Sequence, residues 1–174
     1  MTRSHQVVRA LMALASLGLI VLPYAAGGGL HVAAAVLLVL TVLAVRSPES
    51  LWVAGLLVGH AIHWTATTPA PTRLGDWLAL LAGAWLALLV HVCAGAAATW
   101  PSAAPIPRRG LLRWGRRTAT VALATVPVWG VSMLTRDQSL RGEVSMTFVA
   151  LAALALLSGG VYLLARDAQA APRP

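Results

Sequence analysis

The sequence predicts an all-α integral membrane protein, a bundle of six transmembrane helices with both termini in the cytoplasm. Three observations support this fold class. Hydrophobic residues make up 59% of the 174 residues and charged residues only 10%, with a mean hydropathy of +0.78. Such a composition is typical of chains whose solvent is lipid. The apolar residues also fall into long runs separated by turn residues, and arginines cluster beside these runs on one predicted side of the membrane.

Turn residues and charges divide the apolar runs into six predicted helices that form one transmembrane domain over residues 1–174. The predicted helices cover about residues 7–26, 30–45, 48–66, 76–100, 118–134 and 144–165. The glycine triplet 27–29 predicts the first turn, and the proline-containing segment 67–75 predicts an outer loop. Ser47 and Pro48 predict an N-cap and a first-turn proline for the third helix. Pro127 predicts a bend in the fifth, as a hinge or as a static kink.

The segment between the fourth and fifth predicted helices, residues 101–117, sets the orientation because it carries a cluster of arginines. Arginines in short loops stay on the cytoplasmic side, since transfer across the bilayer is costly. All 13 basic residues are arginines, and ten of them fall on this predicted inner side. We therefore expect a cytoplasmic loop that contacts anionic lipid headgroups and not nucleic acid. The contacts are expected from Arg108, Arg109, Arg113, Arg116 and Arg117.

Small residues and histidines occur together on the third and fourth predicted helices. Small residues at helical spacing let helices pack closely, and the positions concerned are Gly55, Gly59, Gly83, Ala87 and Gly95. His60 and His63, at i and i+3, share part of one helix face. With a rise of about 1.5 Å per residue, His60 and His91 reach similar depths in the membrane. The pattern predicts that these two histidines can approach each other.

Three interpretations of His60, His63 and His91 stay open. They can hydrogen-bond neighbouring helices as structural groups, bind haem or a metal ion, or line a ligand cavity. In the second case His60 and His91 are the expected ligands, with His63 as an alternate. No carboxylate lies in the middle of a predicted helix, which argues against proton-coupled transport and against acid–base catalysis inside the membrane. No cofactor is assigned from the sequence.

The arginine segment PIPRRGLLRWGRR and the proline-containing TVPVWG that follows it resemble uncharacterised small polytopic membrane proteins of high-GC actinobacteria. The resemblance implies a cell (inner) membrane location and no activity. Independently, the lack of catalytic charge and the helix-packing residues lead us to expect a non-enzymatic accessory or assembly subunit of a cell-envelope membrane complex. Its expected partners are the lipid bilayer and other membrane proteins. The alternatives are a haem- or metal-binding membrane redox protein and a small-solute or lipid transport component.

Overall fold

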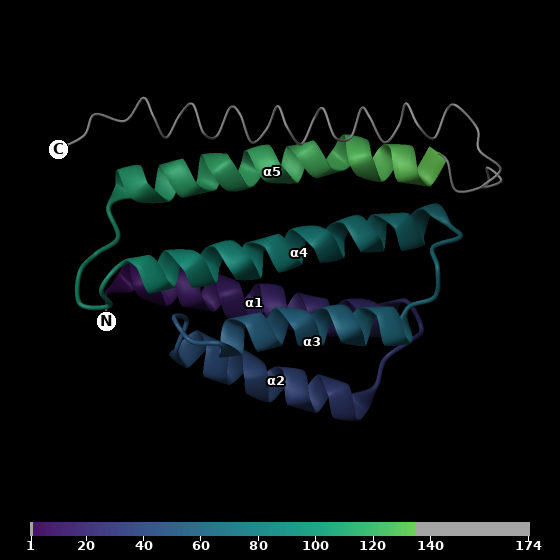
Figure 1. Ribbon diagram of the computed structural model, residues 1–174, viewed down its shortest axis with the longest axis horizontal. Coiled ribbons are helices and arrows are strands. Elements are labelled where there is room, and N and C mark those ends of the chain that lie inside the picture. Colours follow the sequence, from purple (N-terminus) through teal and green to yellow (C-terminus); the bar gives the residue numbers. More distant parts are fainter. Residues whose placement is uncertain (1, 135–174) are drawn as a thin grey trace. The chain divides into compact units, whose positions relative to one another are not determined.

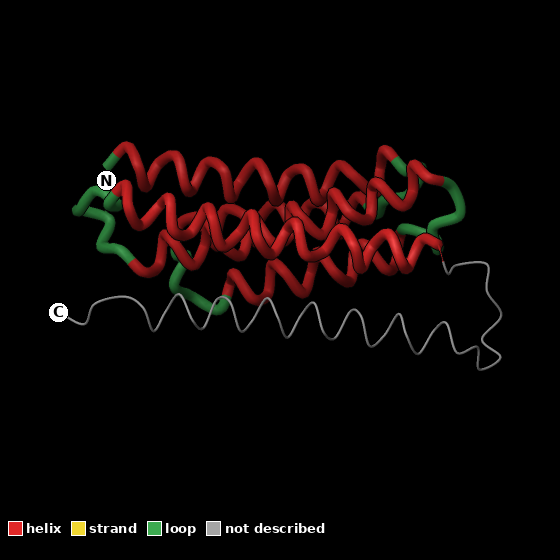
Figure 2. Tube along the Cα trace, turned by 90° about the horizontal axis from the view of Figure 1, so that it is seen from above, coloured by secondary structure: helices red, strands yellow, loops and turns green. Residues whose placement is uncertain are grey.

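A computed structural model describes residues 2–134 of the chain, and every regular element in that range is an α-helix (Figures 1 and 2). The helices are α1 (Arg3–Ala25), α2 (His31–Arg46), α3 (Trp52–Thr67), α4 (Leu74–Thr99) and α5 (Arg108–Leu134). The all-α class is therefore confirmed over these residues. The sixth predicted helix, residues 144–165, lies outside the described range, as does the loop before it.

The chain divides after Trp114 into two compact units, Met1–Trp114 and Gly115–Pro174. The first unit holds α1 to α4 and the first turns of α5. The described part of the second unit is the remainder of α5, in which Pro127 lies inside the helix. A single transmembrane domain over residues 1–174 stays a prediction.

Two of the described helices, α1 and α4, are long and apolar enough to cross a membrane. Their 23 and 26 residues extend about 34 and 39 Å at about 1.5 Å per residue, more than the hydrocarbon core of about 30 Å. The helices α2 and α3, with 16 residues each, extend only about 24 Å. Length and composition thus identify two candidate spans among residues 2–134.

The third helix begins later than the sequence predicts, at Trp52 instead of residue 48. Residues 47–51 form turns, in which the Ser50 hydroxyl donates a hydrogen bond to the Ser47 carbonyl at 2.6 Å. The same hydroxyl oxygen accepts from the Trp52 N–H at 3.3 Å. Ser47 is therefore not the N-cap, and Pro48 does not lie in the first helical turn, because the Ser50 hydroxyl supplies the polar contact at the helix start.

The fifth helix begins earlier than predicted, so residues 108–117 of the expected cytoplasmic loop are helical. Arginine and leucine are good helix formers, and a high density of charge does not by itself break a helix. The first turn closes when the Leu111 N–H donates to the Pro107 carbonyl at 3.1 Å. Only residues 101–107 of the predicted loop remain outside a helix.

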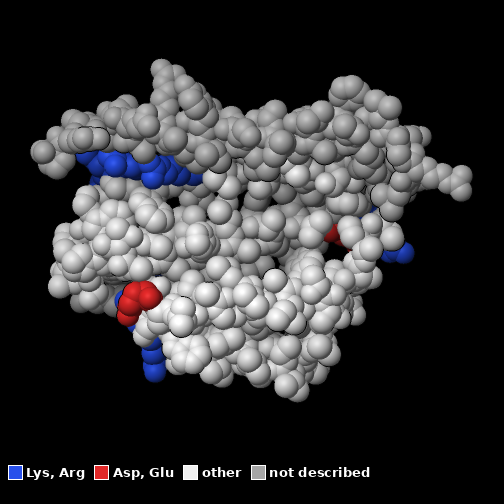
Figure 3. All heavy atoms as spheres, viewed as in Figure 1, with Lys and Arg blue, Asp and Glu red and all other residues white. Residues whose placement is uncertain are grey.

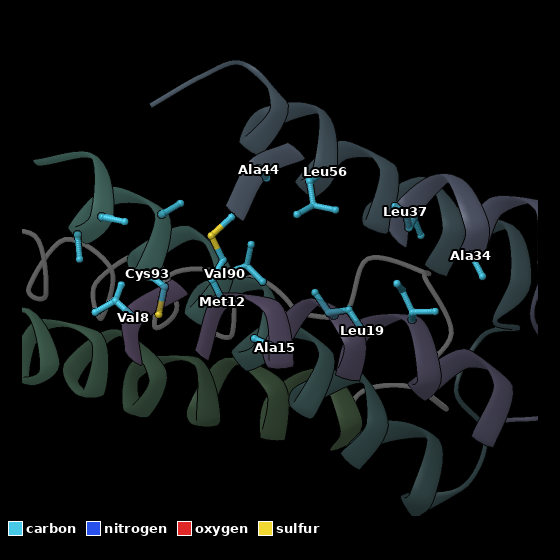
Figure 4. Packing of buried hydrophobic residues seen from close by; sticks show 14 of the residues in the cluster. Val8, Met12, Ala15, Leu19, Ala34, Leu37, Ala44, Leu56, Val90 and Cys93 are labelled. Carbon is cyan, nitrogen blue, oxygen red and sulfur yellow. The ribbon is translucent and has the colours of Figure 1, made fainter. Parts of the chain in front are cut away.

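The hydrophobic core of the first unit lies between α1, α2, α3 and α4. Met12, Leu56 and Val90, which come from three different helices, are all fully buried, and Figure 4 shows them among the side chains that fill this space. The outward surface is also apolar, with Val32 of α2 80% exposed. A bundle that is apolar on both its inner and outer faces is suited to a lipid solvent.

The α1 helix ends at the glycine triplet, which also contacts the end of α3. Gly27 has a φ of +84°, a left-handed conformation that side chains rarely adopt. A Cβ atom on Gly28 would overlap the carbonyl oxygen of Thr67. The close approach of two backbones therefore requires glycine at position 28, and it fixes the α1–α2 turn against the end of α3.

Candidate functional site

Three polar side chains meet in the apolar interior of the first unit. Ser16 of α1, Thr41 of α2 and His60 of α3 are all buried. The Ser16 hydroxyl lies 2.6 Å from the Thr41 hydroxyl and 2.8 Å from His60 Nε2. We call these three residues the polar clamp, because their hydrogen bonds join three helices.

The donor and acceptor in each bond of the polar clamp follow from the proton count. The Thr41 hydroxyl donates to the Leu37 carbonyl at 2.7 Å, so its single proton is unavailable to Ser16. Ser16 must then donate to Thr41, and its own proton is unavailable to His60. A neutral His60 therefore donates through Nε2–H and keeps Nδ1 as an unprotonated acceptor. That Nδ1 is buried and has no hydrogen-bond partner among residues 2–134.

A second buried histidine, His63, lies one turn further along α3 and is 3% exposed. Neither of its ring nitrogens has a hydrogen-bond partner within the described part of the chain. Its ring centroid lies 6.4 Å from that of Tyr24 on α1. The Tyr24 hydroxyl is 3.1 Å from His31 Nδ1, and the two rings stack with centroids 5.5 Å apart. Aromatic and imidazole groups thus continue from the polar clamp toward the glycine turn.

The structure does not bring His91 to His60. His91 is exposed on α4, whereas Val90 and Cys93 point into the core. Consecutive helical residues are rotated by about 100°, so similar depth does not place two side chains face to face. His60 and His63 are therefore buried together on α3, and His91 lies apart from them. No group of three or more His, Cys, Asp or Glu residues that could hold a metal ion occurs among residues 2–134.

A partly open groove of about 260 Å³ lies beside the polar clamp, between α1, α3 and α4. We call it the α3–α4 groove, and its walls are Leu19, Leu57, His60, Ala61, Trp64, Thr65, Leu80, Gly83, Ala84 and Ala87. The small residues of α4 leave the space that larger side chains would fill. The groove carries no charged residue, and apolar walls with a few polar groups are typical of small-molecule sites.

The predicted packing glycines mostly accommodate large side chains. A Cβ atom on Gly59 would lie 2.9 Å from Leu37, and one on Gly95 would lie 3.1 Å from Trp114. Gly83 would place its Cβ 3.2 Å from the Trp64 ring. Gly55 has nothing within 4 Å of its Cβ position, and Ala87 packs partly buried against the core. Gly59, Gly83 and Gly95 therefore receive leucine and tryptophan side chains from neighbouring segments.

The predicted headgroup-binding arginines lie on the first turns of α5. Four of their side chains are exposed, those of Arg108, Arg109, Arg113 and Arg116. The side chain of Arg117 is half-buried. Trp114, on the same turns, packs edge-on against Trp100 with ring centroids 6.1 Å apart. These turns thus carry both exposed guanidinium groups and a packed indole, the combination expected of a helix at a lipid–water boundary.

Most arginines of the first unit lie at one end of it, where Figure 3 shows blue side chains near the start of α5 and, beside a red one, near the turn between α2 and α3. Arg9 Nη1 donates to the Arg46 carbonyl at 3.2 Å, which joins the start of α1 to the end of α2. The Ile106 N–H donates to the Ser4 hydroxyl at 3.1 Å, which brings the α4–α5 connection to the same end. At the start of α4, the Asp76 carboxylate accepts from the Arg73 N–H at 2.9 Å. The charged residues of this unit therefore lie at helix ends.

Two members of the polar clamp, Ser16 and Thr41, are not singled out by the sequence pattern. The available signal is weak: Thr41 is the only hydroxyl residue in α2, and Ser16 lies in the middle of the apolar α1. No protein-family model matches the chain, and comparisons with curated proteins and with solved structures give no match either. Function is therefore inferred from the geometry of this chain.

Proposed function

We propose that the chain is a multi-pass protein of the cell (inner) membrane, with six transmembrane helices and both termini in the cytoplasm. The lengths of α1 and α4 support the membrane assignment. The end of the first unit that carries Arg9 and Arg46 would face the cytoplasm, because basic residues are retained on that side. The shorter α2 and α3 would cross through local thinning of the bilayer or through snorkelling of flanking residues.

In that membrane, the protein would act as a non-enzymatic accessory or assembly subunit of a cell-envelope complex. The observation that carries this proposal is the exposed side chain of His91. His91 is about 26 Å from the start of α4 and about 12 Å from its end, at about 1.5 Å per residue. An imidazole at this depth is costly to leave against lipid. A polar group on a transmembrane helix of a partner protein would cover it.

The geometry favours this role over haem or metal binding by the same histidines. His60 directs Nε2 to Ser16 at 2.8 Å, so one of its two possible ligand nitrogens is engaged within the bundle. His91 is exposed on a different helix and does not face the polar clamp. His60 is therefore better suited to joining helices, and the exposed His91 to joining subunits.

The test is site-specific photo-crosslinking in membranes of the native host. A benzophenone amino acid replaces His91 in one variant and Val39, which is 60% exposed in the middle of α2, in the matched control. We expect a discrete adduct of higher mass with one other membrane protein at position 91 and none at position 39. Adducts with lipid alone at both positions would overturn the proposal. So would a crosslink from position 91 only to another segment of this chain.

A further inference from the structure

We propose that the α3–α4 groove binds a neutral two-ring molecule that carries a hydroxyl group as hydrogen-bond donor. His91 is not among the residues that line the groove, so the inference goes beyond the proposed subunit function. It rests on the size of the groove, on the nature of its walls, and on the protons already committed to bonds within the bundle.

The volume of the groove sets the size of the ligand. An apolar cavity of about 150 Å³ is enough to bind benzene, and the α3–α4 groove holds about 260 Å³. A second fused ring therefore fits, whereas a larger polycyclic molecule would extend beyond the walls. The absence of charged residues from these walls selects a neutral molecule, because an unpaired charge at this position would be costly.

The polar atoms on the walls determine which hydrogen bond the ligand can make. The Thr65 hydroxyl donates to the carbonyls of Ala61 and Ile62, at 3.0 and 3.1 Å. Its proton is therefore used, and its oxygen offers lone pairs only. Thr65 is exposed and lines the groove, so this acceptor is accessible to a ligand.

The other polar residues of the groove do not supply a competing donor. His60 donates its Nε2–H to Ser16, and its remaining Nδ1 is an unprotonated nitrogen buried within the bundle. Trp64 directs the Cζ3–Cη2 edge of its indole toward Gly83, at 3.2 and 3.3 Å from a Cβ built there. That edge is the one remote from the indole N–H. The groove thus presents the Thr65 hydroxyl oxygen as its accessible acceptor, and a ligand with a hydroxyl donor matches it.

The experiment measures binding of 2-naphthol to the full chain in mild detergent, by equilibrium dialysis against protein-free micelles of the same detergent. We expect saturable binding at one site. The comparison ligand is 2-methoxynaphthalene, which has the same rings but no donor. Since one hydrogen bond contributes about 1 kcal/mol, we expect the methoxy compound to bind about fivefold more weakly. Equal binding of the two compounds would overturn donor recognition.

Three variants and a control assign the site. Ala61→Leu and Ala84→Leu fill the groove from opposite walls, and both positions are exposed, so each should weaken 2-naphthol binding at least tenfold in a folded protein. Ala35→Leu, at an exposed position on α2 outside the groove, should leave binding unchanged. Thr65→Val should remove the preference for 2-naphthol over its methoxy analogue. Binding that survives both groove-filling changes would overturn the proposal.

A farnesylated naphthol tests whether the natural ligand is a phenolic lipid or a free phenol, since both carry the same hydroxyl-bearing rings. Tighter binding of the farnesylated compound than of 2-naphthol, after correction for partition into micelles, would assign the ligand to the phenolic lipids of the bilayer. Equal binding would assign it to free phenols. Both outcomes support a hydroxyl-bearing two-ring ligand, whereas absence of saturable binding for either compound would refute it.

Discussion

Replacement of Ser16 by alanine should weaken the packing of α1, α2 and α3 at a single point. The change removes two hydrogen bonds, of 2.6 and 2.8 Å, and leaves the His60 Nε2–H without an acceptor and the Thr41 oxygen without a donor. Interhelical hydrogen bonds in membrane proteins contribute about 0.6 kcal/mol on average. A buried polar group left unsatisfied costs about 1–3 kcal/mol. We therefore expect the free energy of unfolding to fall by about 1–3 kcal/mol.

The assay is reversible unfolding in mixed micelles with increasing SDS, followed by circular dichroism, for Ser16→Ala, Thr41→Val and the double variant. Because Ser16 donates to Thr41, the two changes should be coupled, and the double variant should lose less stability than the sum of the single losses. The control is Thr99→Val, since the only hydrogen bond of the Thr99 hydroxyl within residues 2–134 is to the Gly95 carbonyl of its own helix. The hydrogen bonds assigned between His60, Ser16 and Thr41 would be refuted if Ser16→Ala lowered the free energy of unfolding by less than about 0.3 kcal/mol, or if the losses of the two single variants were additive.

Three further predictions concern the tautomer of His60, two of the glycines, and His91. Nitrogen-15 NMR of the folded protein at neutral pH should show His60 protonated at Nε2; an Nδ1–H tautomer would contradict the donor assignment. Gly28→Ala should lower the free energy of unfolding by about 1–3 kcal/mol because of the overlap with Thr67, whereas Gly55→Ala, with open space around it, should raise it by up to about 1 kcal/mol. His91→Leu should abolish co-purification of the partner without lowering stability in detergent, and retention of the partner would count against the subunit proposal.

The fold class and the approximate position of each described helix follow from apolar run length, because a membrane-sized helix leaves a strong compositional signal. Helix ends were less predictable. The start of α5 differs from the prediction because clustered arginines are typical of a polar loop, although arginine also forms helix readily. The depth of His91 follows from the rise per residue, but its direction depends on how α4 is rotated, and the position of Val90 and Cys93 in the core decides that rotation.

The polar clamp is harder to predict from the sequence than the helix ends, because it depends on three residues that are far apart in the chain. Ser16, Thr41 and His60 come together only when α1, α2 and α3 have a particular register. Isolated hydroxyl residues in apolar helices often bond to their own backbone, as Thr41 does to Leu37. The sequence pattern therefore identifies His60 as a candidate and gives no information on its partner.

The order of the polar clamp along the chain has a consequence for membrane insertion. Synthesis proceeds from the N-terminus, so α1 and α2 leave the ribosome before α3 does. Ser16 and Thr41 can pair as soon as the first two helices meet, and the hydroxyl oxygen of Ser16 is then the acceptor that awaits the His60 N–H. The most polar residue of the cluster would thus enter the bilayer last, against a hairpin that already offers it a hydrogen bond.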